Sequence, residues 1–112
     1  MSSRIEGKSI YLTRGDTFRK PVEALLPESE TERYQPIEGD NVRFAMKRSY
    51  EDVKPVLVKD IPVDTMVLTL DPEDTKGLPF GKYFFDIQLT YANGDIDTFI
   101  TKGRLHLTEE VD

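Results

Sequence analysis

The strongest constraint on the fold is an alternating run at residues 82–91, KYFFDIQLTY. Large apolar side chains occupy every odd position of this run, and Phe84 is the only apolar residue at an even position. A period of two residues is typical of a β-strand with one buried face. Because burial of one large apolar side chain contributes roughly 1.5–3 kcal/mol, we predict that this strand forms the centre of the core.

A turn signal follows this strand directly. Asn93-Gly94 separates the run from a second alternating segment at residues 96–107. Asn-Gly is the preferred pair of a two-residue type I′ hairpin, in which both central residues take positive φ. We therefore predict two antiparallel neighbouring strands joined by this turn. The apolar parity changes between Ile100 and Leu105, which predicts a β-bulge near Lys102-Gly103.

Five shorter segments show the same alternation, between turns rich in Gly, Pro and Asp. Residues 27–38 carry many glutamates without any period, so we expect an acidic, solvated loop, and we expect a frayed tail at residues 108–112. Pro72-Glu73-Asp74 is expected to start one helical turn. The predicted short strands are residues 8–13, 17–26 with a kink at Pro21, 42–47, 55–60 and 65–70.

These elements predict an all-β fold in one domain, residues 1–112. Short strands at regular spacing, without a convincing amphipathic helix, favour an immunoglobulin-like antiparallel β-sandwich of about seven strands. A small β-barrel is the alternative. An acidic turn leads through Gly81 to Tyr83, and in immunoglobulin-like folds a tyrosine at this place donates its hydroxyl to upstream backbone. We therefore expect Gly81, Tyr83, Asn93 and Gly94 to be structural residues.

Charge and composition exclude several classes of function. The chain has 15 Lys and Arg against 21 Asp and Glu, which argues against nucleic-acid or membrane partners. It has no cysteine, so disulfides and Cys-based zinc sites are absent. The N-terminal sequence lacks the apolar core of a signal peptide, and no segment is apolar enough to span a bilayer. We expect synthesis in the cytoplasm without signal-peptide secretion.

No arrangement of residues predicts catalysis. His106 is the only histidine, so it cannot build a zinc shell and is expected to be an ordinary surface residue. The acidic groups at residues 71–74 and 109–112 lack the spacing of a calcium loop, and Arg14-Gly15-Asp16 is expected to be a simple turn. The serines do not lie in a nucleophile motif, and no phosphate-binding loop occurs. We expect a non-enzymatic protein without a cofactor or metal.

A candidate contact surface lies on the polar parity of the predicted strands. Arg43 and Lys47 alternate with apolar residues, and Tyr50 follows them. Phe84 would face solvent if only one face of its strand is covered. Local packing is the simpler interpretation of Phe84, and contact with a partner is the alternative. The candidate interface residues are Phe84, Arg43, Lys47 and Tyr50.

Three segments together resemble a known family. They are YLTRGDTFRKPVEA at residues 11–24, IEGDNVRFAMKRS at residues 37–49 and LDPEDTKGLPFGKYFFDIQLTYANGDIDTFI at residues 70–100. They are similar to small immunoglobulin-like proteins from tail genes of phages and prophages of Gram-positive bacteria, in particular to the N-terminal domain of the upper baseplate protein. The shared pattern is a GDT opening, a GDx[ILV]xFx[ML][KR] strand and GxYxYDIxLTxxDGxxxTF, with Phe85 here where tyrosine is common.

The resemblance implies a non-enzymatic structural or adaptor role in the baseplate region of a virion tail. It implies other phage tail proteins as partners, synthesis in the bacterial cytoplasm and assembly into the tail. In the family a downstream region contacts the host, and this sequence does not include one, so we expect either a stand-alone module or a protein whose partner is a separate chain. Open sheet edges also allow a homo-oligomer. The alternative is a carbohydrate-binding or adhesion β-sandwich, which predicts an exposed aromatic pair such as Tyr34 and Tyr50.

Overall fold

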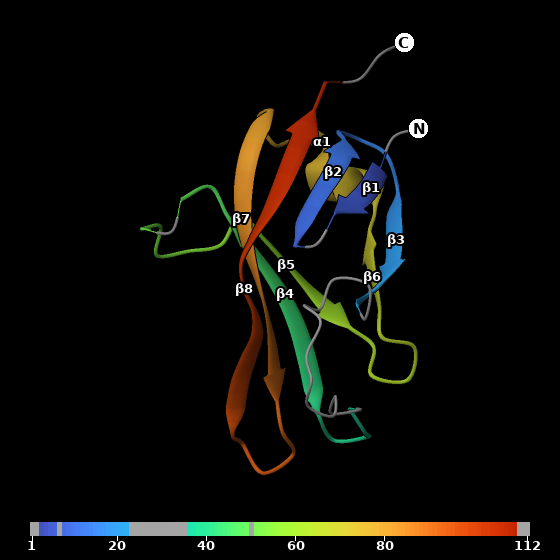
Figure 1. Ribbon diagram of the computed structural model, residues 1–112, viewed down its shortest axis with the longest axis vertical. Helices are drawn as coiled ribbons and strands as arrows, with labels where there is room; N and C mark the ends of the chain where they lie inside the picture. The colour runs from blue at the N-terminus through green and yellow to red at the C-terminus, as the bar shows by residue number, and fades with distance from the viewer. Residues whose placement is uncertain (1–2, 7, 23–35, 50, 110–112) are drawn as a thin grey trace.

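The computed structural model describes residues 3–6, 8–22, 36–49 and 51–109, with the side chains of residues 3–6 and 99–102 outside that description. The described residues form eight strands and one short helix (Figure 1). A mostly β fold with one short helix is therefore confirmed. The elements are β1 (Ser3–Glu6), β2 (Ser9–Thr13), β3 (Phe18–Pro21), β4 (Asn41–Lys47), β5 (Leu57–Ile61), β6 (Val67–Leu70), α1 (Pro72–Lys76), β7 (Gly81–Thr90) and β8 (Ile96–Thr108).

The strands form a large and a small sheet. The large sheet has six strands in the order β1-β2-β8-β7-β4-β5, and the small sheet pairs β3 with β6. The prediction of an entirely antiparallel sandwich is wrong at one place, because β2 pairs with β8 in parallel from Ser9↔Arg104 to Thr13↔Thr108. Parallel neighbours need a long connection, and here nearly the whole domain lies between the two strands. This strand order does not by itself identify an immunoglobulin-like topology.

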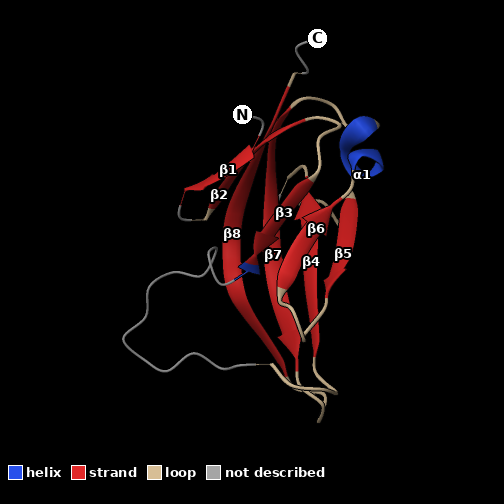
Figure 2. Cartoon of the chain, turned by 90° about the vertical axis from the view of Figure 1, so that its right-hand side faces the viewer, coloured by secondary structure: helices blue, strands red, loops and turns tan. Residues whose placement is uncertain are grey.

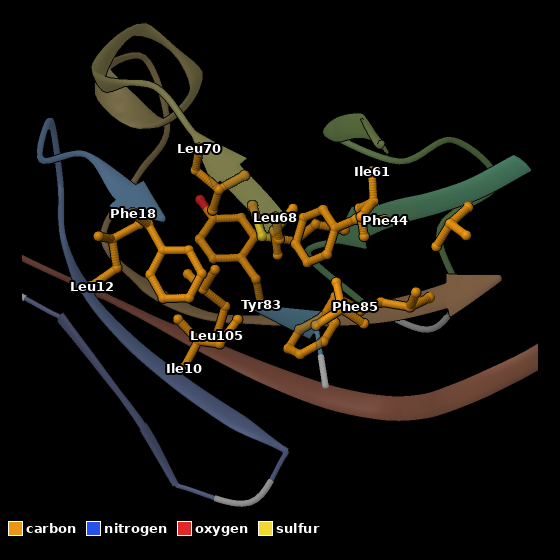
Figure 3. Packing of buried hydrophobic residues seen from close by; sticks show 14 of the residues in the cluster. Ile10, Leu12, Phe18, Phe44, Ile61, Leu68, Leu70, Tyr83, Phe85 and Leu105 are labelled. Atoms are coloured by element: carbon orange, nitrogen blue, oxygen red, sulfur yellow. The ribbon is translucent and has the colours of Figure 1, made fainter. Parts of the chain in front are cut away.

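The small sheet covers one face of the large sheet, as Figure 2 shows. Its residues Phe18, Leu68 and Leu70 belong to the same buried cluster as Tyr83 and Phe85 of β7 (Figure 3). Four of the five predicted inward side chains of the central strand are buried, whereas Tyr91 is only half-buried. The strand at residues 82–91 is thus the centre of the core, as predicted. The remaining buried apolar residues are Ile10, Leu12, Val22, Val42, Phe44, Met46, Ile61, Ile87, Leu89, Leu105 and Leu107.

The shorter predicted elements agree with the structure to within a few residues. The helical turn expected at Pro72 is α1, and the strand expected at residues 42–47 is β4. β3 ends at Pro21, earlier than predicted, and the acidic loop lies outside the described residues up to residue 35. Among the described residues, no helix is long and apolar enough to cross a membrane.

The β7–β8 hairpin has a different turn from the one predicted. Gly94 donates its N–H to the carbonyl oxygen of Tyr91 at 2.8 Å, and Tyr91 donates to the carbonyl oxygen of Asp95 at 2.8 Å. Within this turn, Gly94 takes a positive φ of 97°, whereas Asn93 does not. The connection is a three-residue loop built on a type I turn. Asn93 favours this form because its Oδ1 accepts the N–H of Asp95 at 2.9 Å, so the predicted type I′ turn is wrong.

Strand β8 contains two bulges. Its register with β7 runs from Phe85↔Gly103 to Ile87↔Ile100 and then to Gln88↔Thr98, so β8 has one extra residue in each interval. The first interval confirms the bulge predicted near Gly103, and the second was not predicted. Two slips of one residue restore the original parity, so even-numbered Ile96 faces the same side as even-numbered Arg104. It therefore lies on the outer face, opposite Thr90, and is 65% exposed.

Candidate functional site

The candidate site is on the outer face of the large sheet, on the side away from the small sheet and the core. Strand register places Lys47 of β4 directly opposite Phe84 of β7. The same register places Phe84 opposite Arg104 of β8. Phe84 thus lies in one row across three strands with a cationic residue on each side.

Phe84 also borders a shallow hollow on this face. The hollow measures about 110 Å³ and is lined by Ala45, Lys47, Phe84, Phe85 and Asp86. Pockets that enclose small-molecule ligands usually measure roughly 300–1,000 Å³. The hollow is therefore suited to a single side chain of a partner rather than to a small-molecule substrate. The Phe84 side chain is itself half-buried, which is compatible both with local packing and with contact with a partner.

Apolar side chains extend this surface toward the edge strand β5. Val58 lies opposite Ala45 and is 42% exposed. Val56 precedes β5, donates its N–H to the carbonyl oxygen of Met46 at 2.7 Å and is 43% exposed. We call the surface formed by Val56, Val58, Ala45, Lys47, Phe84 and Arg104 the Phe84 patch.

The charge of the outer face is opposite to that of the whole chain. The described outward-facing side chains of β4, β5, β7 and β8 include four cationic residues and two carboxylates, Asp60 and Asp86. The chain as a whole has a net charge of -6. A local basic surface on an acidic protein is thus present on the side opposite the core. The four cationic residues are Arg43, Lys47, Lys82 and Arg104.

An aromatic pair continues this face toward β2. The rings of Tyr11 and His106 are stacked with centroids 4.6 Å apart and planes 7° from parallel. The pKa of His106 is lowered from its ordinary value, first by burial and then by the positive charges of Lys82 and Arg104. The neutral imidazole is therefore the favoured form in this place.

The structure brings together only some of the predicted interface residues. Phe84 and Lys47 are direct cross-strand neighbours. Arg43 points to the same face, but it lies four residues from Lys47 along β4, which is about 13 Å in an extended strand. Tyr50 and Tyr34 lie outside the described residues, so the aromatic pair of the carbohydrate-binding alternative is not described either.

Two of the predicted structural residues, Gly81 and Tyr83, lie at the start of β7. Tyr83 is buried and donates its hydroxyl to the carbonyl oxygen of Pro79 at 2.6 Å, which is the upstream hydrogen bond expected from the sequence. Arg48 covers the Tyr83 ring at 4.8 Å and donates Nη1 to the carbonyl oxygen of Phe80 at 3.3 Å. Gly81 has a φ of +132°, and a Cβ there would be 2.9 Å from Arg48 Nη1. Only glycine suits that backbone conformation, whereas the Arg48 side chain could shift to relieve the close approach.

A second arginine holds the same loop from the other side. Arg14 lies over the ring of Phe80 at 4.1 Å and donates Nη1 to the carbonyl oxygen of Leu78 at 3.4 Å. Gly15 donates its N–H to the hydroxyl of buried Thr75 at 3.0 Å. The Arg14-Gly15-Asp16 turn is thus part of the packing at this end of the domain. Sequence reasoning missed both arginines, because their partners are 32 and 64 residues away along the chain.

The acidic turn at residues 71–74 is ion-paired. Lys59 Nζ lies 3.0 Å from an Asp74 carboxylate oxygen and 3.5 Å from one of Asp71. The hydrogen bond to Asp74 is the main cause of the raised pKa of Lys59. These contacts join β5 to the acidic turn. Among the described residues, no group of three or more His, Cys, Asp or Glu is arranged to hold a metal ion.

Comparisons of the chain with protein-family models, with curated proteins and with solved structures found no match.

Proposed function

We propose that this protein is a non-enzymatic structural or adaptor protein of a phage or prophage tail that acts through contacts with other tail proteins. The observation that carries the proposal is the spatial arrangement of the segments that resemble the family. The segment at residues 37–49 supplies β4, and the segment at residues 70–100 supplies β7 and the start of β8. These strands are hydrogen-bonded neighbours in the order β8-β7-β4.

The opening segment of the resemblance joins the same arrangement. Its Arg14-Gly15 turn binds α1 through Thr75, and the connection between α1 and β7 through Leu78 and Phe80. Segments that are far apart in the sequence therefore support one another in the fold. An immunoglobulin-like relationship of the two sheets is part of the proposal.

The outer face favours contact with a protein. Its hollow is small and shallow, and half-buried and exposed apolar side chains surround it. Apolar residues with cationic neighbours are typical of protein interfaces, in which aromatic residues serve as anchors. The role proposed for this surface is docking within a larger assembly.

The experiment has a genomic part and a biochemical part. The neighbouring genes are expected to encode tape-measure, tail-tip or lysis proteins. Co-expression of the chain with each neighbouring tail protein is expected to give a complex of fixed stoichiometry, measured by size-exclusion chromatography with light scattering. Metabolic neighbours, or the absence of a complex with every encoded tail protein, would refute the proposal.

A further inference from the structure

We propose that the Phe84 patch binds an acidic polypeptide segment of a partner protein. This inference rests on the proposed function, because it specifies the chemistry of the tail protein that binds. Phe84, Val56 and Val58 would supply apolar contact, and Lys47 and Arg104 would pair with carboxylates. The outer face of the large sheet is then the docking surface.

The row that contains Phe84 has a cationic residue on each side of the aromatic ring's strand. Lys47 and Arg104 lie opposite Phe84 on the two adjacent strands, and adjacent strands are about 4.8 Å apart. Each cationic residue therefore stands within one strand spacing of the aromatic residue. A partner side chain that enters the hollow beside Phe84 brings its neighbouring residues to Lys47 on one side and Arg104 on the other.

The charge of the outer face favours an acidic partner. The described outward-facing side chains of β4, β5, β7 and β8 carry four cations and two carboxylates within a chain of net charge -6. Electrostatic complementarity speeds association with an oppositely charged surface and disfavours like-charged partners. An acidic segment is attracted to this face, whereas a basic segment is attracted to the rest of the protein.

The outer face suits a polypeptide better than a nucleic acid. Phosphate-backbone binding needs several cations that follow the backbone, but on this face Asp86 and the apolar residues Ala45 and Val58 stand between Lys47 and Arg43. The hollow admits one side chain and is lined by Ala45 and Phe84 beside Lys47 and Asp86. A segment that alternates acidic and apolar residues matches both features.

The test is an NMR titration of the ¹⁵N-labelled chain with a synthetic peptide, acetyl-ELEFELE-amide. Amide shifts are expected to change in β4, β7 and β8 around Lys47, Phe84 and Arg104, with affinity that weakens as salt rises. A peptide with lysine in place of each glutamate and a dT oligonucleotide are the probe controls. The same shifts with either control, or no shifts at the patch with the acidic peptide, would overturn the inference.

Variants make the test specific to the patch. Lys47→Glu is expected to weaken peptide binding about tenfold, because it places a like charge beside the carboxylates. Arg43→Glu is the matched control, since it makes the same change on the same strand and face about 13 Å away, and it is expected to change affinity less than threefold. Lys47→Gln and Arg104→Gln, which only remove charge, repeat the test if the reversal perturbs the fold. Equal effects of Lys47→Glu and Arg43→Glu would contradict a defined site.

The outcomes also distinguish this inference from the proposed function. A tail-protein complex that forms normally with Lys47→Glu and Phe84→Ser would overturn the acidic-segment site and leave the tail role intact. Peptide binding at the patch without any tail-protein complex would overturn only the tail role. Concentration-dependent self-association that Lys47→Glu abolishes would show that a second copy of the chain occupies the patch, and would refute a separate partner.

Discussion

Phe84 and Phe85 are adjacent in the sequence but face opposite sides of β7, so a matched pair of substitutions separates surface from core. Phe85 is 2% exposed and belongs to the central cluster. Truncation of a buried phenylalanine to alanine typically costs about 3–5 kcal/mol. Phe84 is half-buried on the outer face, and half of the roughly 1.5–3 kcal/mol for full burial is about 1 kcal/mol. We therefore predict that Phe84→Ser lowers the unfolding free energy by about 1 kcal/mol and Phe85→Ala by at least 3.

The assay is urea unfolding followed by far-UV circular dichroism, with both free energies taken at a common slope. A domain of this kind is stable by about 5–15 kcal/mol, so Phe84→Ser should remain fully folded, whereas Phe85→Ala should lose a large part of its stability. Equal losses for Phe84→Ser and Phe85→Ala would refute the reasoning. Such a result would assign Phe84 to the core and remove it from the docking surface.

Three further predictions concern the supporting structure. Gly103→Ala should lower the unfolding free energy by about 1–3 kcal/mol, because the added Cβ would lie 2.5 Å from Phe85 Cζ. This loss should be smaller when Phe85 is replaced by leucine. An unchanged free energy in urea unfolding would contradict the close packing. Tyr83→Phe should cost about 0.5–1.5 kcal/mol, because it removes the hydrogen bond to Pro79, and unchanged thermal stability would argue against that bond. The lowered pKa of His106 means that the unfolded chain binds its proton more readily. The stability that this lowered pKa contributes is present above pH 6.5, the ordinary pKa of histidine, and is lost as the pH falls through the lower pKa of the folded protein. His106→Gln should remove that part of the pH dependence of stability. Identical pH profiles of the variant and the original protein would contradict this prediction.

The local elements were predictable because their signals are local. Period-two alternation identified β7 and its buried face, and Pro72 after Leu70 marked the start of α1. The change of apolar parity between Ile100 and Leu105 located the bulge near Gly103. In each case the side chains that determine the structure are within a few residues of one another.

The non-local features could not be predicted in the same way. The parallel pairing of β2 with β8 joins opposite ends of the sequence, and alternation does not specify a neighbour. Phe84 was identified by its parity, but its position beside Lys47 depends on the β4–β7 register. Lys59 was read as part of a strand, yet it lies opposite buried Phe44 and reaches Asp74. An inward-pointing charge of this kind also protects an edge strand from pairing with other chains.

The central claim is that the Phe84 patch contacts a separate tail protein, and site-specific photo-crosslinking tests it most directly. A benzoylphenylalanine residue would replace Phe84 in one variant and Lys76, exposed on α1, in a control variant, each co-expressed with the neighbouring tail proteins. We predict a crosslink to an acidic segment of one tail protein from position 84 and none from position 76. Crosslinking from position 76 but not from position 84 would contradict the claim.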